Sequence, residues 1–409
     1  MAAPRSLAGV RILDFSRVLA GPYCTMILGD MGAEVIKVER PGPGDDLRHW
    51  GPPFMPDGES TYFLSVNRNK RSIVLDLKTE AGRNVARRLA CKSDVVVENF
   101  LPGVMESFGL GYDDLAALHP GLVYCSITGY GTVGPLRDRP GYDVIIQAMG
   151  GLMSVTGEPG GTPMRVGVAI VDIVTGLYSA IGVLGALQSR QRTGRGQRVD
   201  LSLLEVGLAC LPNLTSGYLL RGVKPERLGN GHPNTVPYRV FPTRDGMLTL
   251  ATGNDGQWQR LCRAVGHPEF GTDPRYATNA ERVARRAEVE ALVTEWFQQR
   301  TSAEWMERLA SEEVPCGPVY TVDQILADTQ VQALQTVQEI DHPTGGRLRM
   351  VGSPLNFSQD ETAPWLPPPR LGEHTEEVLG AVLGLGTPEL QTLARQGAFG
   401  SGGLGKPAR

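Results

Sequence analysis

The sequence Val10-Arg-Ile-Leu-Asp-Phe15 is the first of five short runs, rich in β-branched and aliphatic residues, in the first third of the chain. The runs occupy residues 10–15, 34–39, 72–77, 94–100 and 122–128. Their apolar residues are continuous rather than alternating, as in strands of a parallel sheet whose two faces are covered by helices. Helix-like stretches, among them residues 24–31 and 81–90, separate the runs. This βαβ alternation predicts an α/β fold with a doubly wound parallel sheet.

The rest of the chain has a different pattern. From about residue 229, a strand-like run is mixed with helical periodicity, which predicts a smaller α+β domain. Residues 173–187 are the longest apolar stretch; a bilayer span needs about 18 to 20 residues, so we expect a buried core helix. The glycine-rich end, residues 397–409, is predicted to be disordered.

The 409 residues are 41% hydrophobic and 21% charged, with a formal net charge of −4. This composition is typical of a soluble globular protein and lacks a basic bias, so we expect neither a nucleic-acid nor a membrane partner. The six cysteines are scattered, without a C-x-x-C pair or a histidine at zinc-ligand spacing, and no metal site is predicted. A strand-like run begins by Val10, which leaves no room for a signal or transit segment and favours a cytoplasmic protein.

Several motifs with known chemistry are absent or out of context. Gly400-Ser-Gly-Gly-Leu-Gly-Lys406 matches glycine-rich nucleotide-binding patterns, but a phosphate cradle needs a strand before it and a helix after it, and only Pro407-Ala-Arg409 follows. The sequence has no G-x-S-x-G or H-E-x-x-H motif. Serine-hydrolase and zinc-protease chemistry therefore lack their usual local signatures.

Asp172 is a single carboxylate at the head of an otherwise apolar, helix-like stretch, Val168-Ala-Ile-Val-Asp172-Ile-Val-Thr175. Two interpretations are open. Asp172 can be a helix N-cap, a common role for Asp just before an apolar run. Alternatively, the helix terminus keeps the carboxylate ionised while apolar neighbours exclude water from an acyl intermediate, as a catalytic nucleophile needs. The two roles are physically compatible.

The chain also carries an ordered set of short motifs. They are Ile12-Leu-Asp-Phe-Ser-Arg-Val-Leu-Ala-Gly-Pro22, Gly32-Ala-Glu-Val-Ile-Lys-Val-Glu-Arg-Pro-Gly-Pro-Gly-Asp45, Asn69-Lys-Arg-Ser-Ile73, Val97-Glu-Asn-Phe100, Gly129-Tyr-Gly131, Gly141-Tyr-Asp143, Thr193-Gly-Arg-Gly196, Pro315-Cys-Gly-Pro318 and Leu371-Gly-Glu-His-Thr375. Together with the Asp172 stretch, the set resembles the family III CoA-transferases (CaiB/BaiF, formyl-CoA transferase-like) over nearly the whole chain.

The resemblance implies a Rossmann-like large domain built from both ends of the chain, a smaller middle domain, and a homodimer of two interlocked rings. On this basis we expect the large domain to begin with residues 1–200 and a linker at 201–228. The small α+β domain then occupies 229–320, and residues 321–396 return to the large domain before the tail at 397–409. None of this architecture follows from the periodicity alone.

By the same resemblance, Asp172 is the catalytic residue. In the family mechanism it attacks an acyl-CoA thioester to give an aspartyl–acyl anhydride, and the CoA thiolate then forms an aspartyl–CoA thioester. Coenzyme A thioesters are substrates, and no permanently bound cofactor or metal is implied. The resemblance assigns CoA contacts to Val18, Ala20, Arg40, Leu75, Lys78, Asn99, Phe100, Tyr142 and Asp143. Two family features differ: a basic residue near the adenosine end is Ser107 here, and a mobile glycine loop has no counterpart.

The same family includes α-methylacyl-CoA racemases, which have Gly-His-Asp where this chain has Gly141-Tyr142-Asp143. Because the ordinary pKa of a phenol is about 10, Tyr142 is a poor base at neutral pH, and racemase chemistry is disfavoured. A racemase or epimerase remains one alternative, and a non-catalytic CoA-binding protein on the same fold is another. The retained Asp172 argues against the second.

Within the family, residues 40–48, 50–53 and 67–71 are most similar to the members that move CoA from succinyl-CoA to glutarate. We therefore expect a dicarboxylate acceptor such as glutarate, hydroxymethylglutarate or malate. Its distal carboxylate needs a cation, ideally a bidentate arginine, and the candidates Arg17, Arg139 and Arg165 lie beside family motifs. A bacterial protein of this kind is expected in the cytoplasm, and a eukaryotic one with a targeting segment in the mitochondrial matrix.

Overall fold

The structure, a computed structural model, describes residues 5–360 and 365–400. These residues form two compact units. The first contains the described residues up to Leu152, Arg165–Ser216, and those from Gln335 onward; the second contains Met153–Met164 and Gly217–Leu334. Segments from both ends of the sequence therefore belong to the same unit.

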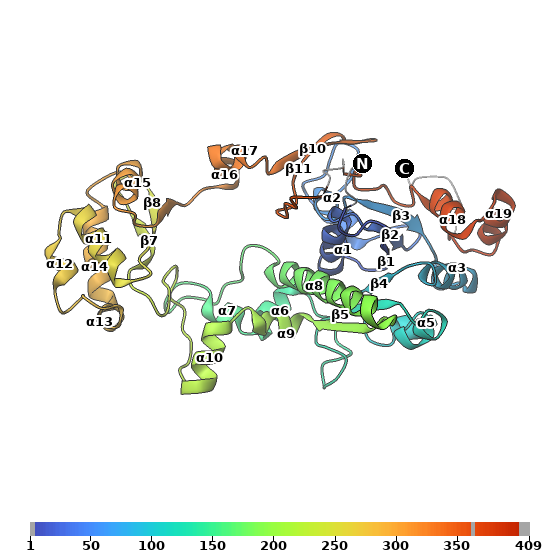
Figure 1. The fold of residues 1–409 in the computed structure, drawn as a ribbon, viewed down its shortest axis with the longest axis horizontal. Helices are drawn as coiled ribbons and strands as arrows, with labels where there is room; N and C mark the ends of the chain where they lie inside the picture. The colour runs from blue at the N-terminus through green and yellow to red at the C-terminus, as the bar shows by residue number, and fades with distance from the viewer. Residues whose placement is uncertain (1–4, 361–364, 401–409) are drawn as a thin grey trace. The chain divides into compact units, whose positions relative to one another are not determined.

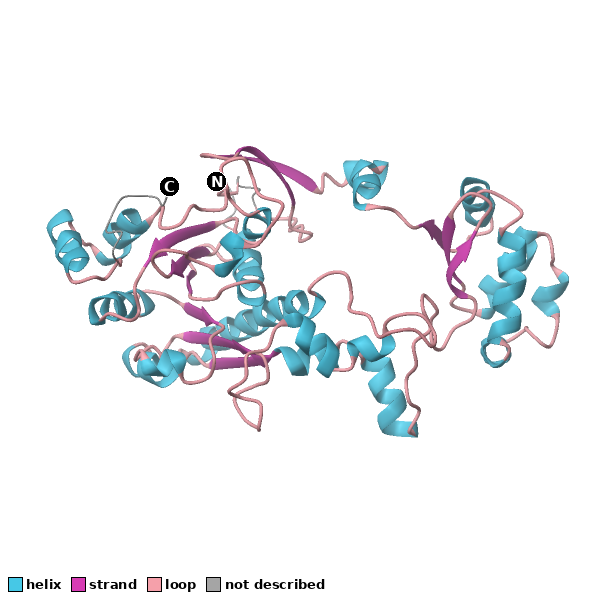
Figure 2. Ribbon diagram, turned by 180° about the vertical axis from the view of Figure 1, so that it is seen from behind, coloured by secondary structure: helices cyan, strands magenta, loops and turns pink. Residues whose placement is uncertain are grey.

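The first unit is built on a six-stranded parallel sheet with the strand order β3-β2-β1-β4-β5-β6 (Figure 1 and Figure 2). The strands are β1 (Arg11–Asp14), β2 (Glu34–Glu39), β3 (Lys70–Val74), β4 (Val95–Glu98), β5 (Val123–Thr128) and β6 (Arg198–Ser202). Ile12 of β1 lies opposite Val35 of β2 and Val95 of β4, so β1 is central. The predicted parallel sheet is confirmed, and β6 adds an edge strand to the five predicted runs.

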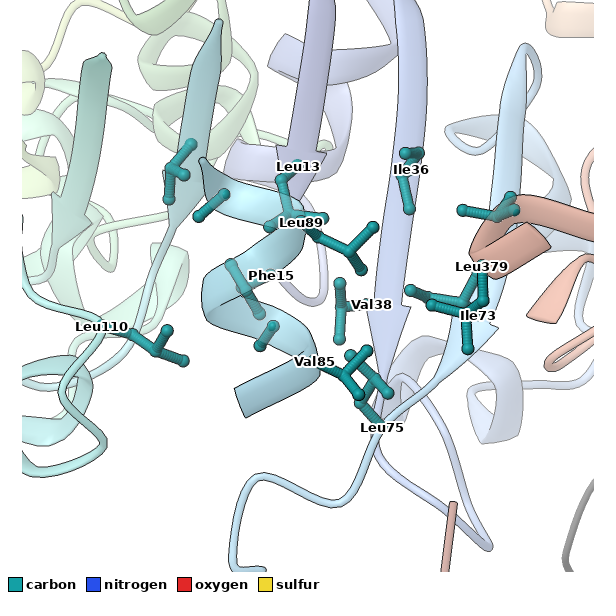
Figure 3. Close-up of a cluster of buried hydrophobic side chains, with 14 of the residues drawn as sticks. Leu13, Phe15, Ile36, Val38, Ile73, Leu75, Val85, Leu89, Leu110 and Leu379 are labelled. Atoms are coloured by element: carbon teal, nitrogen blue, oxygen red, sulfur yellow. The ribbon is translucent and has the colours of Figure 1, made fainter. Parts of the chain in front are cut away.

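Helices cover both faces of this sheet, and each face has its own apolar core. One core includes side chains of α1 (Ala20–Asp30) and α8 (Ile170–Thr193). The other includes side chains of α3 (Glu80–Ala90), α5 (Tyr112–Leu118), α18 (Thr375–Leu383) and α19 (Thr387–Arg395). Figure 3 shows Leu13, Ile36 and Ile73 of three neighbouring strands against Val85 and Leu89 of α3. The continuous apolar strands follow from this burial on both faces.

Shorter elements connect the strands and continue the chain. They are η1 (Asp46–His49), α2 (Thr61–Ser65), α4 (Val104–Ser107), α6 (Asp143–Met149), α7 (Leu152–Val155), α9 (Leu203–Ala209), α10 (Pro212–Arg221) and the antiparallel pair β10 (Val337–His342) and β11 (Gly346–Val351). The segment predicted as a linker, 201–228, thus contains α9 and α10.

α1 begins at Ala20, earlier than the helix predicted at 24–31. Gly21 and Pro22, two residues that usually interrupt helices, lie in its first turn. The first N–H groups of a helix have no partner within the helix, so a proline is accommodated there.

α8 has 24 residues and extends beyond the apolar stretch predicted at 173–187. By length and composition alone, it is the single helix in the described part of the chain that is long and apolar enough to cross a membrane, a test that core helices also pass. α8 packs against α1, and Ala180 and Val183 are buried in the core on this face of the sheet. One face of α8 thus belongs to the core, as expected, whereas Leu177, Tyr178 and Ile181 are exposed, so the helix is buried only in part.

The second unit contains a three-stranded antiparallel sheet of β7 (Tyr238–Pro242), β8 (Met247–Ala251) and β9 (Cys316–Pro318). Its helices are α11 (Asp255–Val265), α12 (Glu269–Thr272), α13 (Asn279–Ala284), α14 (Arg286–Phe297), α15 (Ser302–Ser311), α16 (Val322–Ala327) and α17 (Thr329–Ala333). Trp258, Trp296 and Trp305 are buried in its core. Large aromatic side chains therefore supply much of the apolar area of this unit.

The structure differs from the predicted disordered tail at residues 397–400. Ala398 and Phe399 are buried in the core of the first unit, and the Ala398 carbonyl accepts a hydrogen bond from Asp76 N at 2.8 Å. The rest of that tail, residues 401–409, with nearly all of the glycine-rich motif, lies outside the described residues.

Candidate active site

A cavity of about 210 Å³ lies beside the carboxyl ends of β1, β2, β3 and β4. The loops that follow parallel strands meet at this edge of a sheet, where ligands usually bind in α/β folds. The cavity is lined by Arg17 after β1, Arg40 after β2, Leu75 and Lys78 after β3, and Phe100 after β4. The fold therefore brings together four of the residues predicted to contact CoA, together with Arg17.

Val18, Ala20 and Asn99, predicted to contact CoA, are in or beside the loop after β1. The backbone N of Arg17 donates to Asn99 Oδ1 at 2.9 Å, and Asn99 Nδ2 donates to the Arg17 carbonyl at 2.8 Å. Val18 has a left-handed φ of 64°, which is rare for a β-branched residue, and its N–H donates to Asp45 Oδ1 at 3.1 Å. Ala20 is the first residue of α1 and is buried. These hydrogen bonds fix the backbone of the loop at the edge of the cavity.

A buried network of ion pairs holds the loops after β1 and β2. Lys37 Nζ donates to Asp45 Oδ2 at 2.8 Å and to the Ser16 carbonyl at 2.9 Å, and all three residues are buried. Lys70 Nζ lies 3.4 Å from Asp14 Oδ2 in the same network. Burial raises the pKa of Asp14, but the charges of Lys70 and Lys37, with two hydroxyl hydrogen bonds, lower it overall. Sequence reasoning missed this network, although a lysine in the middle of a buried strand implies a buried partner.

Two arginines at the cavity share one carboxylate. Arg17 Nη1 lies 3.3 Å from Asp46 Oδ2, and Arg40 Nη2 is hydrogen bonded to Asp46 Oδ1. Lys78 lines the same cavity and makes no ion pair within residues 5–360 and 365–400. This set of cations suits a ligand rich in phosphate groups.

Asp172 is the third residue of α8, not its N-cap. The cap is supplied by another helix, because Asp143 Oδ1 accepts the backbone N–H groups of Val171 at 2.9 Å and of Asp172 at 3.3 Å. Gln147 Nε2 donates to the other Asp143 oxygen at 2.6 Å. The simple capping interpretation of Asp172 is therefore wrong, and its carboxylate remains available for chemistry.

The environment of Asp172 makes its ionised form costly. Burial, and to a smaller degree the neighbouring charge of Asp143, raises the pKa of Asp172 to about 7. Desolvation increases the nucleophilicity of the ionised carboxylate, and the positive end of the α8 dipole stabilises that form. Near neutral pH, Asp172 can therefore act as a nucleophile and can regain a proton.

A second cavity, of about 430 Å³, is lined by Trp50, Gly51, Pro52, Pro53, Thr61 and Tyr62. Burial raises the pKa of Tyr62, the charges of Asp172 and Asp143 add to this, and the charge of Arg165 opposes it. Tyr62 is therefore within electrostatic range of all three residues. Ala169 and Ile173, on either side of Asp172, belong to the same apolar cluster as Tyr62. Tyr62 was missed because only the fold brings it near Asp172.

The structure separates the three arginines predicted to bind the distal carboxylate. The charge of Arg165 acts on Tyr62, and Arg165 is itself exposed, whereas Arg17 lines the 210 Å³ cavity. Arg139 is exposed in the loop before α6. Tyr142, just before α6, is also exposed, and the adjoining Asp143 carboxylate is buried against α8. CoA contacts of Tyr142 and Asp143 stay predictions.

The described residues contain no group of three or more histidine, cysteine, aspartate or glutamate side chains that could hold a metal ion. Each of the six cysteines is a free thiol in the structure.

Comparison with known proteins identifies relatives over almost the whole chain. Residues 7–375 match the family model described as CoA-transferase family III. A succinate–glutarate CoA-transferase of Agrobacterium fabrum is 45% identical over 394 residues, covering 95% of this chain and 96% of that protein. A succinyl-CoA:glutarate CoA-transferase of Mus musculus is 44% identical over 379 residues, covering 93% of this chain and 87% of the relative.

A solved structure is also similar. The crystal structure of a CaiB/BaiF family protein from Brucella suis superposes with a TM-score of 0.81 at 42% identity, covering 93% of this chain and 100% of that chain. The family model and these relatives extend over the β-sheet loops, the α8 segment and the second unit. The chain belongs to CoA-transferase family III and is a CoA-transferase enzyme.

Proposed function

We propose that this enzyme transfers CoA from succinyl-CoA to a dicarboxylic acid such as glutarate, with Asp172 as the nucleophile. The observation that carries the proposal is the desolvated Asp172 carboxylate in the first turn of α8. This carboxylate does not cap the helix, because Asp143 accepts the backbone N–H groups of that turn. The names of the two relatives at 44% and 45% identity support the choice of donor and acceptor.

The proposed reaction is a sequence of four acyl transfers. The Asp172 carboxylate attacks the thioester carbonyl of succinyl-CoA, which gives an aspartyl–succinyl anhydride and free CoA thiolate. The thiolate attacks the aspartyl carbonyl, which releases succinate and leaves an aspartyl–CoA thioester. Glutarate displaces the thiolate to form an aspartyl–glutaryl anhydride. Attack of the thiolate on the glutaryl carbonyl gives glutaryl-CoA and regenerates Asp172.

A carboxylate suits this sequence because its anhydride and thioester are similar in energy to the substrates, so each step is easy. A serine ester would be too stable. Apolar groups near Asp172, including Ala169 and Ile173, limit the access of water to the anhydride. This shielding matters because the chain has no counterpart of the family's glycine loop.

In this proposal the two cavities bind different parts of the substrate. Arg40 and Lys78 bind the phosphate groups of CoA at the 210 Å³ cavity, with Leu75 and Phe100 against its apolar parts. The acyl end extends toward Asp172 and Tyr62. Arg165 binds the distal carboxylate of the dicarboxylate, because its charge acts on the same group, Tyr62, as that of Asp172.

We further propose a Rossmann-like first unit and a homodimer. The strand order, with β1 central and successive strands added on either side, supports the Rossmann-like assignment. Exposed apolar side chains on α8, including Tyr178 and Ile181, the latter 64% exposed, support a subunit interface. Light scattering after gel filtration tests the assembly: a dimer supports it, and a monomer at micromolar concentration contradicts it.

The function is tested with purified protein, succinyl-CoA and, in separate reactions, glutarate, hydroxymethylglutarate and malate, with acyl-CoA products followed by mass spectrometry. We expect glutaryl-CoA from the native enzyme and none above background from Asp172→Ala. Asp113→Ala, which removes an exposed carboxylate in the first turn of α5, is the control and should keep full activity. Equal turnover by Asp172→Ala, or hydrolysis without transfer, would contradict the proposal.

A further inference from the structure

Asp46 is a negative charge paired with two arginines that line the cavity where the proposed function puts the phosphate groups of CoA. Its carboxylate is 40% exposed and bonds the guanidinium groups of both Arg17 and Arg40. Both arginines line the cavity, together with Lys78, which makes no ion pair with any other described residue. An anionic ligand that enters this cavity therefore meets two cations that already share one carboxylate, which offsets one of their two positive charges.

Neither arginine depends on Asp46 for its position. The backbone of Arg17 is held by two hydrogen bonds with Asn99, and its guanidinium lies 4.9 Å from the centre of the Phe100 ring. Arg40 Nε donates to the Gly44 carbonyl at 2.9 Å. Arg17 Nε is buried and has no hydrogen-bond partner in the structure, so this arginine has an unused donor. Removal of the Asp46 charge should thus leave both arginines in place.

Asp46 is also separate from the buried network that supports the loops. Lys37 is paired with Asp45, and Arg48 with Glu39, so these inner charges compensate one another. Asp46 is left as the outer carboxylate of the group, in contact with solvent and with the two arginines.

We infer that Asp46 is an internal competitor for the phosphate groups of CoA and sets how tightly CoA thioesters are held. When the ligand binds, its phosphate groups replace Asp46 as the partner of Arg17 and Arg40. The ion pairs of Asp46 with both arginines are then lost, and this loss reduces the affinity for the ligand. A transferase must release one acyl-CoA after each turnover, so moderate binding at this position favours product release. This inference rests on the proposed function, since it takes CoA as the ligand.

The test measures the dissociation constant of CoA by isothermal titration calorimetry for the native protein, Asp46→Asn and Asp46→Ala. Exposed ion pairs are worth up to about 1 kcal/mol, so we expect both variants to bind CoA about two- to fivefold more tightly. Dephospho-CoA, which lacks the 3′-phosphate, serves as a second ligand. The Asp46 substitutions should increase the affinity for dephospho-CoA less than the affinity for CoA. Asp200→Asn, which frees the half-exposed Arg198 from a similar ion pair on β6, is the matched control and should not change the constant.

The possible results distinguish a failure of the Asp46 inference from a failure of the proposed function. Tighter binding by both variants, with Asp200→Asn unchanged, supports the inference. Equal or weaker binding by folded Asp46 variants, when the native protein binds CoA, overturns it and leaves the proposed function intact. If the native protein does not bind CoA at all, the proposed function and this inference fail together.

Discussion

Replacement of Asp143 by asparagine tests whether the electrostatics at the start of α8 control Asp172. Asp143 Oδ1 accepts hydrogen bonds from the N–H groups of Val171 and Asp172, and asparagine keeps an oxygen that can accept them. Gln147 Nε2 loses its acceptor, Asp143 Oδ2, which costs about 1 kcal/mol of folding free energy. The variant should therefore fold, with its main change being one fewer negative charge beside Asp172.

The size of the effect follows from the geometry. Asp143 Oδ1 is 3.3 Å from the backbone N of Asp172, and the Asp172 carboxylate is three bonds further on. At a separation of about 6 Å and an effective dielectric constant of about 20, the repulsion between the carboxylates is about 3 kcal/mol, or about two pKa units. Burial remains the larger cause of the raised pKa, and solvent screening reduces the repulsion. We therefore expect a fall of about one unit from the native pKa of about 7.

The assay is the pH dependence of kcat/KM for succinyl-CoA at saturating glutarate. In the proposed mechanism the ionised Asp172 is the reactive form, so the native rate should fall as the pH drops through about 7, and the midpoint should lie lower in Asp143→Asn. Asp200→Asn, a loss of charge on β6, is the control and should keep the native midpoint. An unchanged or higher midpoint in a folded Asp143→Asn protein would refute this account of the site.

Three further predictions concern stability and substrate binding. The pKa of Asp172 is about 7 in the folded protein against an ordinary 3.8, so its ionisation opposes folding increasingly between pH 4 and 7. Above pH 7, Asp172→Asn should therefore raise the free energy of unfolding by about 1 to 3 kcal/mol, and with it the Tm. Thermal unfolding that shows no gain above pH 7, or the same gain at pH 4, contradicts this. Lys37→Met leaves Asp45 buried without its cation and should lower the free energy of unfolding by about 3 to 5 kcal/mol in urea titrations; a loss below about 1 kcal/mol would show that the pair is dispensable. Arg165 and Arg139 are both exposed, but the charge of Arg165 acts on Tyr62, so Arg165→Ala should raise KM for glutarate at least tenfold and Arg139→Ala should not; the reverse order in steady-state kinetics would reassign the distal carboxylate.

The periodicity of the sequence was sufficient for the sheet, because continuous apolar runs have few alternatives to buried parallel strands. It was less informative where elements begin. α1 starts at Ala20 because a first turn tolerates Gly21 and Pro22, although both residues usually interrupt helices. Phe399 lies in the apolar core, although the glycines around it are typical of a disordered tail.

The resemblance assigned roles to individual residues, but it gave no information about how these residues contact one another. The motifs gave Arg40, Lys78 and Asp172 their expected roles by resemblance, and the structure brings the first two to one cavity. The hydrogen bonds of Asp143 to α8 and the proximity of Tyr62 to Asp172 join segments far apart in the sequence, and local pattern carries no information about such contacts. The Asp46 pairings depend on side-chain geometry and were likewise invisible.

Covalent catalysis by Asp172 is the central claim, and trapping of the aspartyl–CoA thioester tests it most directly. The enzyme is mixed with succinyl-CoA without acceptor, reduced with borohydride, digested, and analysed by peptide mass spectrometry. Borohydride converts an aspartyl thioester to an alcohol, so the account predicts this mass change on the peptide that contains Asp172, dependent on succinyl-CoA. An unmodified Asp172 peptide, or reduction at another carboxylate, in enzyme that turns over normally would contradict the account.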